Sequence, residues 1–192
     1  MNELTQADSK MKPVQHLLAI VLIALLAACS VPKDEWVTFT SAAGNFSVRV
    51  PGAMQESVNV TSTPLGPIEA HVFTLQHGAY HYSITYTDYP VPHLAEANPV
   101  GAVEGEVLQT LEALGATISN KRDIFLDDAF GIQFRGTFPS VGNSDGAGVV
   151  AGRVYLNKTR PYQLVVVART AQVDTATPQK FFDSFQWLST PE

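Results

Sequence analysis

The chain has 192 residues, with 12 Lys and Arg against 18 Asp and Glu, so its formal net charge is −6, and it contains one cysteine. Because the basic residues are few and scattered, the sequence lacks the electrostatic footprint of a nucleic-acid-binding protein. A single cysteine also excludes an internal disulfide, so packing has to hold the fold together.

The N-terminus has the layout of an export signal. Lys10 and Lys12 precede an unbroken apolar run over residues 17–28, which small residues close. As a helix, a run of this length reaches about 18 Å, well short of the roughly 30 Å hydrocarbon core of a bilayer. We therefore expect residues 1–28 to be a signal peptide and not a permanent transmembrane helix. The start of translation, Met1 or Met11, stays open.

The apolar run ends in Leu26-Ala27-Ala28-Cys29. This motif resembles the lipobox of bacterial lipoproteins, in which a leucine and two small residues precede a cysteine. In that class the cysteine thiol takes a diacylglyceryl group, the chain is cut before the cysteine, and the new amino end is often acylated as well. The resemblance implies a lipid-attachment site at Cys29 and anchoring of the chain to a membrane of the cell envelope.

The residue after this cysteine is Ser30 and not an aspartate. In double-membrane bacteria that sort lipoproteins in the enteric way, this implies the outer membrane, with the protein facing the periplasm. In a single-membrane host the anchor would lie in the cell membrane. The sequence does not decide between inner and outer membrane.

Behind the anchor we expect one domain. Residues 29–35 form the lipidated cysteine and a short tether, whose last six residues span about 20 Å when fully extended. Residues 36–188 contain no Pro/Gly/Ser-rich stretch, charge block or repeat that would divide them, so they are predicted to be a single globular domain. Residues 189–192 form a short polar tail.

The first half of this domain has the period-two alternation of strands. Residues 36–40 and 45–50 predict two strands, the second of which ends before Pro51 and Gly52. A strand from Tyr80 alternates aromatic or apolar residues with polar ones. If His77-Gly78 is a two-residue hairpin loop, the apolar faces of the two flanking strands coincide. The expected cross-strand pairs are then Leu75 with Tyr80, Phe73 with Tyr82, and His71 with Ile84.

An amphipathic helix is predicted between Asn98 and Gly115, with Asn98 as N-cap, Pro99 in the first turn and the glycine as its stop. Its apolar positions are spaced by three and four: Val100, Val103, Val107, Leu111 and Leu114.

The second half predicts four more strands and a final helix. The strands cover residues 117–125, 130–138, 149–156 and 162–169. The last has apolar groups on both faces, which is typical of a central strand covered on both sides. The final helix begins at Thr177-Pro178, and its apolar stripe is Phe181, Phe182 and Phe185.

The predicted order is strands, a helix, further strands and a second helix, and hairpin-length loops join the strands within each group. This order indicates an α+β domain with an antiparallel sheet. Residues 46–51, the hairpin from residues 153–156 to 162–164, and residues 181–185 resemble the PsbP-like domain. Members include extrinsic photosystem subunits, a nuclear-import factor and many exported bacterial lipoproteins. The resemblance implies an αβα sandwich over residues 36–188 and a role in binding partners instead of catalysis. It assigns no binding residue to this chain.

Two stretches of the sequence are weak candidates for a reactive or metal-binding site. Asp127 and Asp128 are adjacent, so on an extended chain they point to opposite faces, and we interpret them as a solvated turn. The glycine-rich residues 142–148 lack the ligand repeat of a calcium loop and are interpreted as a connection.

Three histidines, His71, His77 and His81, raise the question of a metal site because imidazole is a common metal ligand. The expected hairpin register places His71 on the inner face, His81 on the outer face and His77 in the turn, so we predict neither a metal site nor a cofactor. Tyr80, Tyr82, Tyr86 and Tyr89 could form a recognition surface, but we expect the first three to pack in the core.

The sequence therefore favours a membrane-anchored envelope lipoprotein that is not an enzyme and that binds or assembles with an unknown envelope protein. The domain is expected to be a monomer. Two alternatives stay open: a hydrolase whose site is assembled from distant residues, and a small-ligand carrier with a pocket between sheet and helix.

The lipid anchor can be tested directly at Cys29. The variant Cys29→Ser is expected to incorporate no palmitate and to keep its signal peptide, because only the thiol can form the thioether and lipid addition precedes cleavage in this class. In the unaltered protein two or more acyl chains, at about 0.8 kcal/mol per buried methylene, hold the chain on the membrane. Metabolic labelling with palmitate measures the first effect, and the apparent mass of the chain measures the second. Undiminished label on the variant would contradict the lipobox interpretation.

Overall fold

The structure is a computed structural model of the chain, and it describes residues 35–64, 66–89, 98–139, 147–169 and 176–188. Contacts divide the chain into two units, Met1–Glu35 and Trp36–Glu192. The expected signal peptide, Cys29 and nearly all of the tether lie outside the described residues. Within the described part, no helix is both long and apolar enough to span a bilayer.

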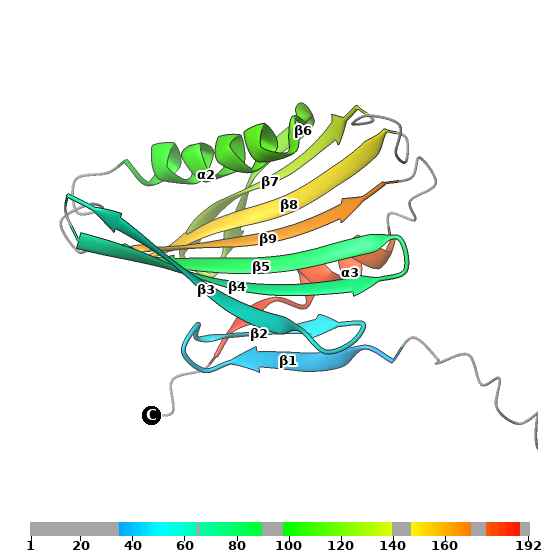
Figure 1. Ribbon diagram of the computed structural model, residues 1–192, viewed down its shortest axis with the longest axis horizontal. Helices are drawn as coiled ribbons and strands as arrows, with labels where there is room; N and C mark the ends of the chain where they lie inside the picture. Colours follow the sequence, from blue (N-terminus) through cyan, green and yellow to red (C-terminus); the bar gives the residue numbers. More distant parts are fainter. Residues whose placement is uncertain (1–34, 65, 90–97, 140–146, 170–175, 189–192) are drawn as a thin grey trace, which may run out of the picture. The chain divides into compact units, whose positions relative to one another are not determined.

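Seven strands form one large sheet in which every neighbouring pair is antiparallel. From edge to edge the order is β3-β4-β5-β9-β8-β7-β6 (Figure 1). Its strands are β3 (Gln55–Thr63), β4 (Gly66–His77), β5 (Tyr80–Asp88), β6 (Thr117–Leu126), β7 (Ala129–Phe138), β8 (Gly148–Asn157) and β9 (Arg160–Ala168).

A second, three-stranded sheet contains the two strands expected at the start of the domain. The strands β1 (Val37–Ser41) and β2 (Phe46–Val50) pair as a hairpin, and β10 (Gln186–Trp187) pairs with the other edge of β2. The strands predicted from residues 36–40 and 45–50 are therefore confirmed. They do not join the large sheet, and β10 was not predicted.

The large sheet lies between two layers (Figure 1). The helix α2 (Pro99–Leu114) packs on β7, β8 and β9. The helix α3 (Ala176–Asp183) and the small sheet pack against the opposite face. The predicted α+β fold with an antiparallel sheet and helices on its faces is confirmed, with the addition that one covering layer also contains strands.

The strand β9 is the centre of the large sheet, as its two apolar faces predicted. Leu164 and Val166 point into the core shared with the small sheet, and Val165 points into the core under α2. All three side chains are buried. Because neighbouring residues of a strand point to opposite faces, this strand contributes to both cores at once.

The boundaries of α2 match the sequence prediction. The Asn98 side chain accepts a hydrogen bond from the backbone N–H of Val100, and Gly115 ends the helix in the left-handed conformation at φ 59°. The buried side of the helix consists of Val103, Val107 and Leu111. Val100, expected on that side, is 43% exposed at the first turn.

Phe46 is fully buried at the centre of the aromatic core between the two sheets. Its ring centroid lies 5.9 Å from that of Phe73, 6.3 Å from Tyr162 and 5.3 Å from Phe185. These rings come from both sheets and from the segment after α3. Tilted and edge-to-face ring pairs add about 0.5–1.5 kcal/mol each beyond their buried area, so this cluster joins segments far apart in the sequence.

Gly44 is required where the β1–β2 turn meets this core. A Cβ atom at this position would lie 2.6 Å from the ring of Phe46 and 2.8 Å from that of Tyr86. The Tyr162 hydroxyl also donates a 3.0 Å hydrogen bond to the Gly44 carbonyl. Any larger residue would force these rings apart.

The predicted register of the β4–β5 hairpin is wrong by two residues, because the loop begins one residue later than expected. His77 pairs with Tyr80, so the loop is Gly78-Ala79, and the cross-strand pairs are Leu75 with Tyr82, Phe73 with Ile84 and His71 with Tyr86. The first loop residue needs a positive φ, and Gly78 adopts 57° there at little cost. The shift keeps the same residues on each face, so the apolar faces still coincide.

The final helix ends earlier than its apolar stripe predicted. Phe181 and Phe182 lie in α3, whereas Phe185 follows the helix and precedes β10, although all three side chains are buried. The Arg153 guanidinium holds the end of α3, since it donates to the Phe182 carbonyl at 3.0 Å and to Asp183 at 2.7 Å. Burial acts to raise the pKa of Asp183, but hydrogen bonds from Gln179 and Arg153 bring it below its ordinary value.

The stability of the domain should depend on the phenylalanines around α3. Phe182→Ala or Phe185→Ala is expected to lower the free energy of unfolding by about 3 to 5 kcal/mol, because each leaves a cavity where a buried ring was. The control His81→Ala, at an exposed position, should change it by less than about 0.5 kcal/mol. Urea denaturation monitored by circular dichroism measures both. Equal losses in all three variants would contradict the packing described for this core.

Candidate functional site

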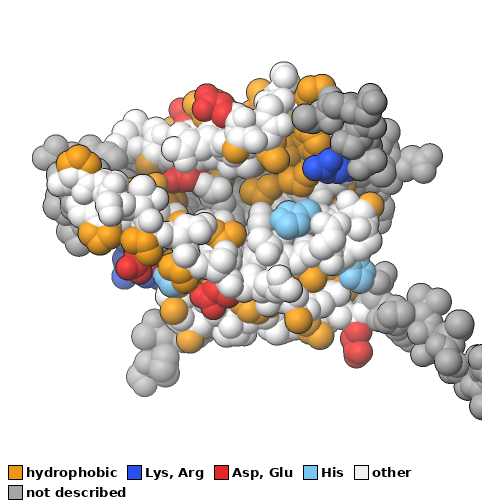
Figure 2. Space-filling view, in the orientation of Figure 1, with side chains coloured by type: hydrophobic (Ala, Val, Ile, Leu, Met, Phe, Trp, Pro, Cys, Tyr) orange, Lys and Arg blue, Asp and Glu red, His pale blue; other side chains and the backbone are white. Residues whose placement is uncertain are grey.

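Charged side chains of the described residues are scattered over the face drawn in Figure 2 and do not gather into one patch. An open groove with a volume of about 410 Å³ lies between α2 and β6. We call it the α2–β6 groove. Its lining residues are Glu104, Val107, Leu108, Ile118, Ser119, Asn120 and Lys121.

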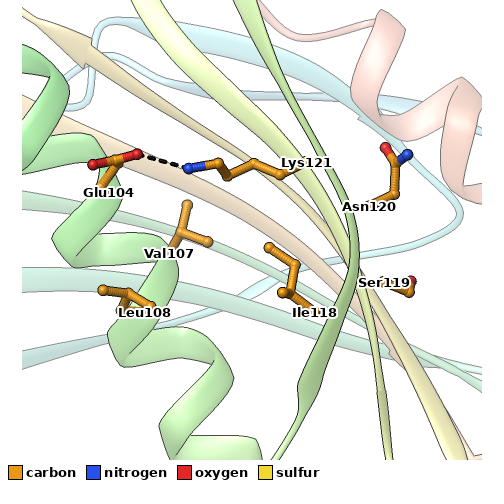
Figure 3. A pocket seen from close by; sticks show the side chains of 7 residues that line it. All are labelled: Glu104, Val107, Leu108, Ile118, Ser119, Asn120 and Lys121. Carbon is orange, nitrogen blue, oxygen red and sulfur yellow. Dashed lines mark hydrogen bonds and ion pairs between the residues drawn. The ribbon is translucent and has the colours of Figure 1, made fainter.

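Apolar side chains form one part of the groove. Figure 3 shows Val107 and Leu108 on the helix and Ile118 on the strand around one shared space. Leu108 is 58% exposed and Ile118 is 42% exposed, although both are large hydrophobic residues. Apolar surface in a concave site with polar surroundings is typical of a binding site.

An ion pair bridges the two walls of the groove. The Lys121 ammonium donates to the Glu104 carboxylate at 2.6 Å (Figure 3). Both side chains are more than two-fifths exposed, so the pair contributes little to stability. It adds a charged, hydrogen-bonding edge to a site whose floor is apolar.

The strand side of the groove is irregular. β6 is the outermost strand of the large sheet and pairs with β7, but its register shifts between Ile118 and Asn120, which leaves Ser119 as a bulge. A bulge bends its strand and redirects the neighbouring side chains. Beside this bulge Ile118 points toward α2, whereas the Ser119 side chain points to the other side of the strand (Figure 3).

A polar junction fixes α2 on the central strand β9 of the sheet. The Tyr89 hydroxyl donates to the Glu106 carboxylate at 3.0 Å, the Gln163 amide also donates to Glu106, and the Thr110 hydroxyl donates to Gln163 at 3.2 Å. Burial and the nearby Glu106 charge raise the pKa of Tyr89 to about 12. The helix is thus held by directional contacts as well as by its apolar side.

A second set of polar contacts joins the turns at the other side of the core. Arg160 donates to Asp88 at 2.6 Å and to the Ala43 carbonyl at 2.9 Å, and its guanidinium lies 4.8 Å from the centre of the Tyr86 ring. Burial raises the pKa of Tyr162, and a hydrogen bond with Arg160 opposes that shift. These groups satisfy one another, so we interpret the cluster as structural.

The three histidines lie apart. His71 is on the core side of β4, stacked on Tyr86 with ring centroids 4.5 Å apart and 3.3 Å from the Glu56 carboxylate. His81 is exposed on the opposite face of β5. His77 was expected in the turn but is the last residue of β4. Among the described residues no three His, Cys, Asp or Glu side chains are grouped so that they could hold a metal ion.

The other predicted residues fall outside the groove. Asp127 and Asp128 form the β6–β7 turn, where Asp127 has a φ of 51°, as the interpretation as a turn requires. Tyr82 and Tyr86 are buried in the core, and Tyr80 packs against it. Of the glycine-rich stretch 142–148, all but the last two residues lie outside the described part of the chain, as does Cys29.

Sequence reasoning did not single out Leu108 or Ile118. Leu108 follows the buried Val107 directly, so a helix that buries one of them exposes the other. The signal available in the sequence was the position of Leu108, a large apolar residue beside the buried side of the helix. Ile118 offered none, because its exposure depends on how far α2 extends over the sheet, and the helix leaves β6 beyond it.

A likeness to one solved structure supports the fold. The solution structure of cyanobacterial PsbP (CyanoP) from Synechocystis sp. PCC 6803 aligns with a TM-score of 0.54 and 11% identity, over 82% of this chain and 95% of that one. A crystal structure of a protein of unknown function from Pseudomonas aeruginosa covers 71% of this chain and 85% of its own, with a TM-score of 0.36 and 11% identity. No family and no curated protein matches the chain. The chain thus has a PsbP-like fold, as its resemblance predicted.

The polar junction predicts an unusual titration of Tyr89. The Tyr89 proton should be lost only near pH 12, so the stability that it contributes is complete below pH 10 and is lost as the pH rises through about 12. In Glu106→Gln the pKa should fall, because the carboxylate charge that favours the protonated hydroxyl is gone. The titration is followed by tyrosinate absorbance in the unaltered chain and in Glu106→Gln. Subtracting the absorbance of the same chain carrying Tyr89→Phe isolates the signal of Tyr89. An unchanged titration in Glu106→Gln would contradict the proposed cause.

Proposed function

We propose that the chain is a lipid-anchored module of the bacterial envelope that binds a protein partner and does not catalyse a reaction. The observation that carries this proposal is the α2–β6 groove, where Leu108 and Ile118 are exposed beside the Glu104–Lys121 ion pair. An apolar floor with a charged edge suits the side chains of another protein.

The membrane part of the proposal rests on Leu26-Ala27-Ala28-Cys29 and on the signal-like run before it. With a tether of about 20 Å at full extension, the domain would meet its partner close to the membrane surface. For an outer-membrane anchor this partner belongs to the periplasm or to the membrane itself.

The chemistry of the described residues supports binding over catalysis. Groups with shifted pKa values, such as Tyr89 and Asp183, lie at junctions between elements and not around the groove. A hydrolase would require reactive groups that converge on a cleft. The groove lining offers one carboxylate, and that carboxylate is paired with Lys121.

A small-ligand carrier is the second candidate. A hollow of about 260 Å³ lies between the large sheet and α3, with Val149, Val166 and Ala168 on the sheet side and Pro178 on the helix. Its volume is slightly below the roughly 300 Å³ at which pockets for drug-sized ligands begin, so it would take a small apolar molecule. Such a carrier would retain that molecule in native mass spectrometry.

The docking proposal can be tested with a photo-crosslinking amino acid. Placed at Leu108 in the lipidated chain, it should form a covalent adduct with one envelope protein in living cells. The matched control is the same amino acid at Gln109, which is exposed on the same helix but does not line the groove. Leu108→Glu should reduce capture at Ile118 at least tenfold, because it places a charge on the apolar floor. Equal adducts at Leu108 and Gln109 would overturn the assignment of the groove.

A further inference from the structure

The two edges of the large sheet differ in how they are protected from pairing. Unpaired backbone groups at a sheet edge can bind another strand, and proteins usually prevent this with charged residues, prolines or bulges. β6 has Lys121, Arg122 and Asp123 in its middle and a bulge at Ser119. This edge is therefore protected.

The opposite edge, β3, has none of these features apart from one charge. Its nine residues pair with β4 along their whole length without a shift in register. It contains no Lys, Arg or Pro, and its single charged residue is Glu56, which lies 3.3 Å from His71. All its residues except Thr63 are exposed. β3 is thus a long, regular edge that remains able to pair.

Two valines lie in the middle of one face of β3, between Glu56 and Ser62. Val58 is 48% exposed and Val60 is 60% exposed, and as alternate residues they lie on the same face of the strand. In Figure 2 hydrophobic side chains reach the surface along β3. β-branched residues pair well across neighbouring strands, so this face is suited to a second strand of similar composition.

We propose that β3 pairs antiparallel with β3 of a second copy of this chain, with Asn59 at the two-fold axis. In this register Val58 lies opposite Val60 of the second copy, and by symmetry Val60 lies opposite Val58 of the second copy. Each Asn59 lies opposite its counterpart, where the two amides can hydrogen-bond to each other. The two large sheets then become one continuous antiparallel sheet.

The valines select this register among the neighbouring ones, because a shift of two residues in either direction would place Val60 opposite Glu56 or Val58 opposite Ser62. Charge acts in the same direction. Each Glu56 lies opposite Ser62 of the second copy, and the two glutamates are separated by six residues along the strands, about 20 Å. That separation exceeds the Debye length of about 8 Å at physiological ionic strength. Sliding the strands until Glu56 faces Glu56 would bring like charges together and separate the valines, so it is disfavoured.

The dimer departs from the monomer expected from the sequence, because that expectation did not include β3. One strand edge is a small contact, so the dimer should be weak and dependent on concentration. The inference does not depend on the α2–β6 groove, which lies at the other edge of the sheet.

Disulfide crosslinking of the full chain tests the pairing. In Asn59→Cys the two introduced thiols face each other across the axis, at the Cα spacing of about 4.5 to 5.5 Å that antiparallel pairs and disulfides share. Mild oxidation should convert most of the protein into a covalent dimer. The control Gln55→Cys, equally exposed on the same strand, should remain at the level of the unaltered chain, whose only cysteine is Cys29.

A second substitution separates pairing from chance collision. Val60→Lys, added to Asn59→Cys, should reduce the covalent dimer at least fivefold, because it places a charge opposite the apolar Val58. Val37→Lys, at a similarly exposed valine of β1, should leave the yield unchanged. Equal crosslinking of Asn59→Cys and Gln55→Cys, no dimer with Asn59→Cys, or a yield that ignores Val60→Lys would each overturn the proposal.

Discussion

Alternate residues of β9 point to opposite faces of the large sheet, and most of them are apolar and buried. A sheet of this kind is stable only when both faces are removed from water, because each aliphatic side chain left exposed loses roughly 1.5–3 kcal/mol of stabilisation that its burial would provide. α2 covers one face, and the small sheet with α3 covers the other. The helix caps, the ring cluster around Phe46 and the Arg153 contacts to α3 all hold these covering layers in place.

The covering layers are narrower than the sheet, and the exposed features arise where they end. α2 packs on β7, β8 and β9 but leaves β6 beyond it, which creates the α2–β6 groove. At the other edge β3 extends past the small sheet's core and is exposed on both faces. The candidate binding surfaces therefore lie at the two edges of the large sheet, which the covering layers do not reach. One edge carries the α2–β6 groove, and the other carries the exposed strand β3.

The partly buried polar groups of this fold mainly form hydrogen bonds and ion pairs between neighbouring elements. Glu106 connects α2 to β9 through Gln163, Arg153 connects β8 to α3, and Arg160 connects β9 to the β1–β2 turn. Partly buried charges need partners, since an unpaired one carries a large desolvation cost. Here each is paired at a boundary between elements, which explains why the shifted pKa values are dispersed over the domain and do not mark one cleft.

Local patterns in the sequence determined the elements whose signals lie within a few residues of one another. The caps of α2, the two-sided apolar pattern of β9 and the alternation of β5 are of this kind, and the resemblance to PsbP-like domains, carried by short packing segments, correctly indicated the fold. Other features depended on tertiary structure. β3 has polar residues on one face and exposed valines on the other, so no burial pattern marked it, and β10 exists because Trp187 pairs with Phe46, far away in the chain. The groove and the difference between the two sheet edges arise only when the layers are assembled. Which side chains of β6 and β3 are exposed depends on how far the covering helix and the small sheet extend over the large sheet.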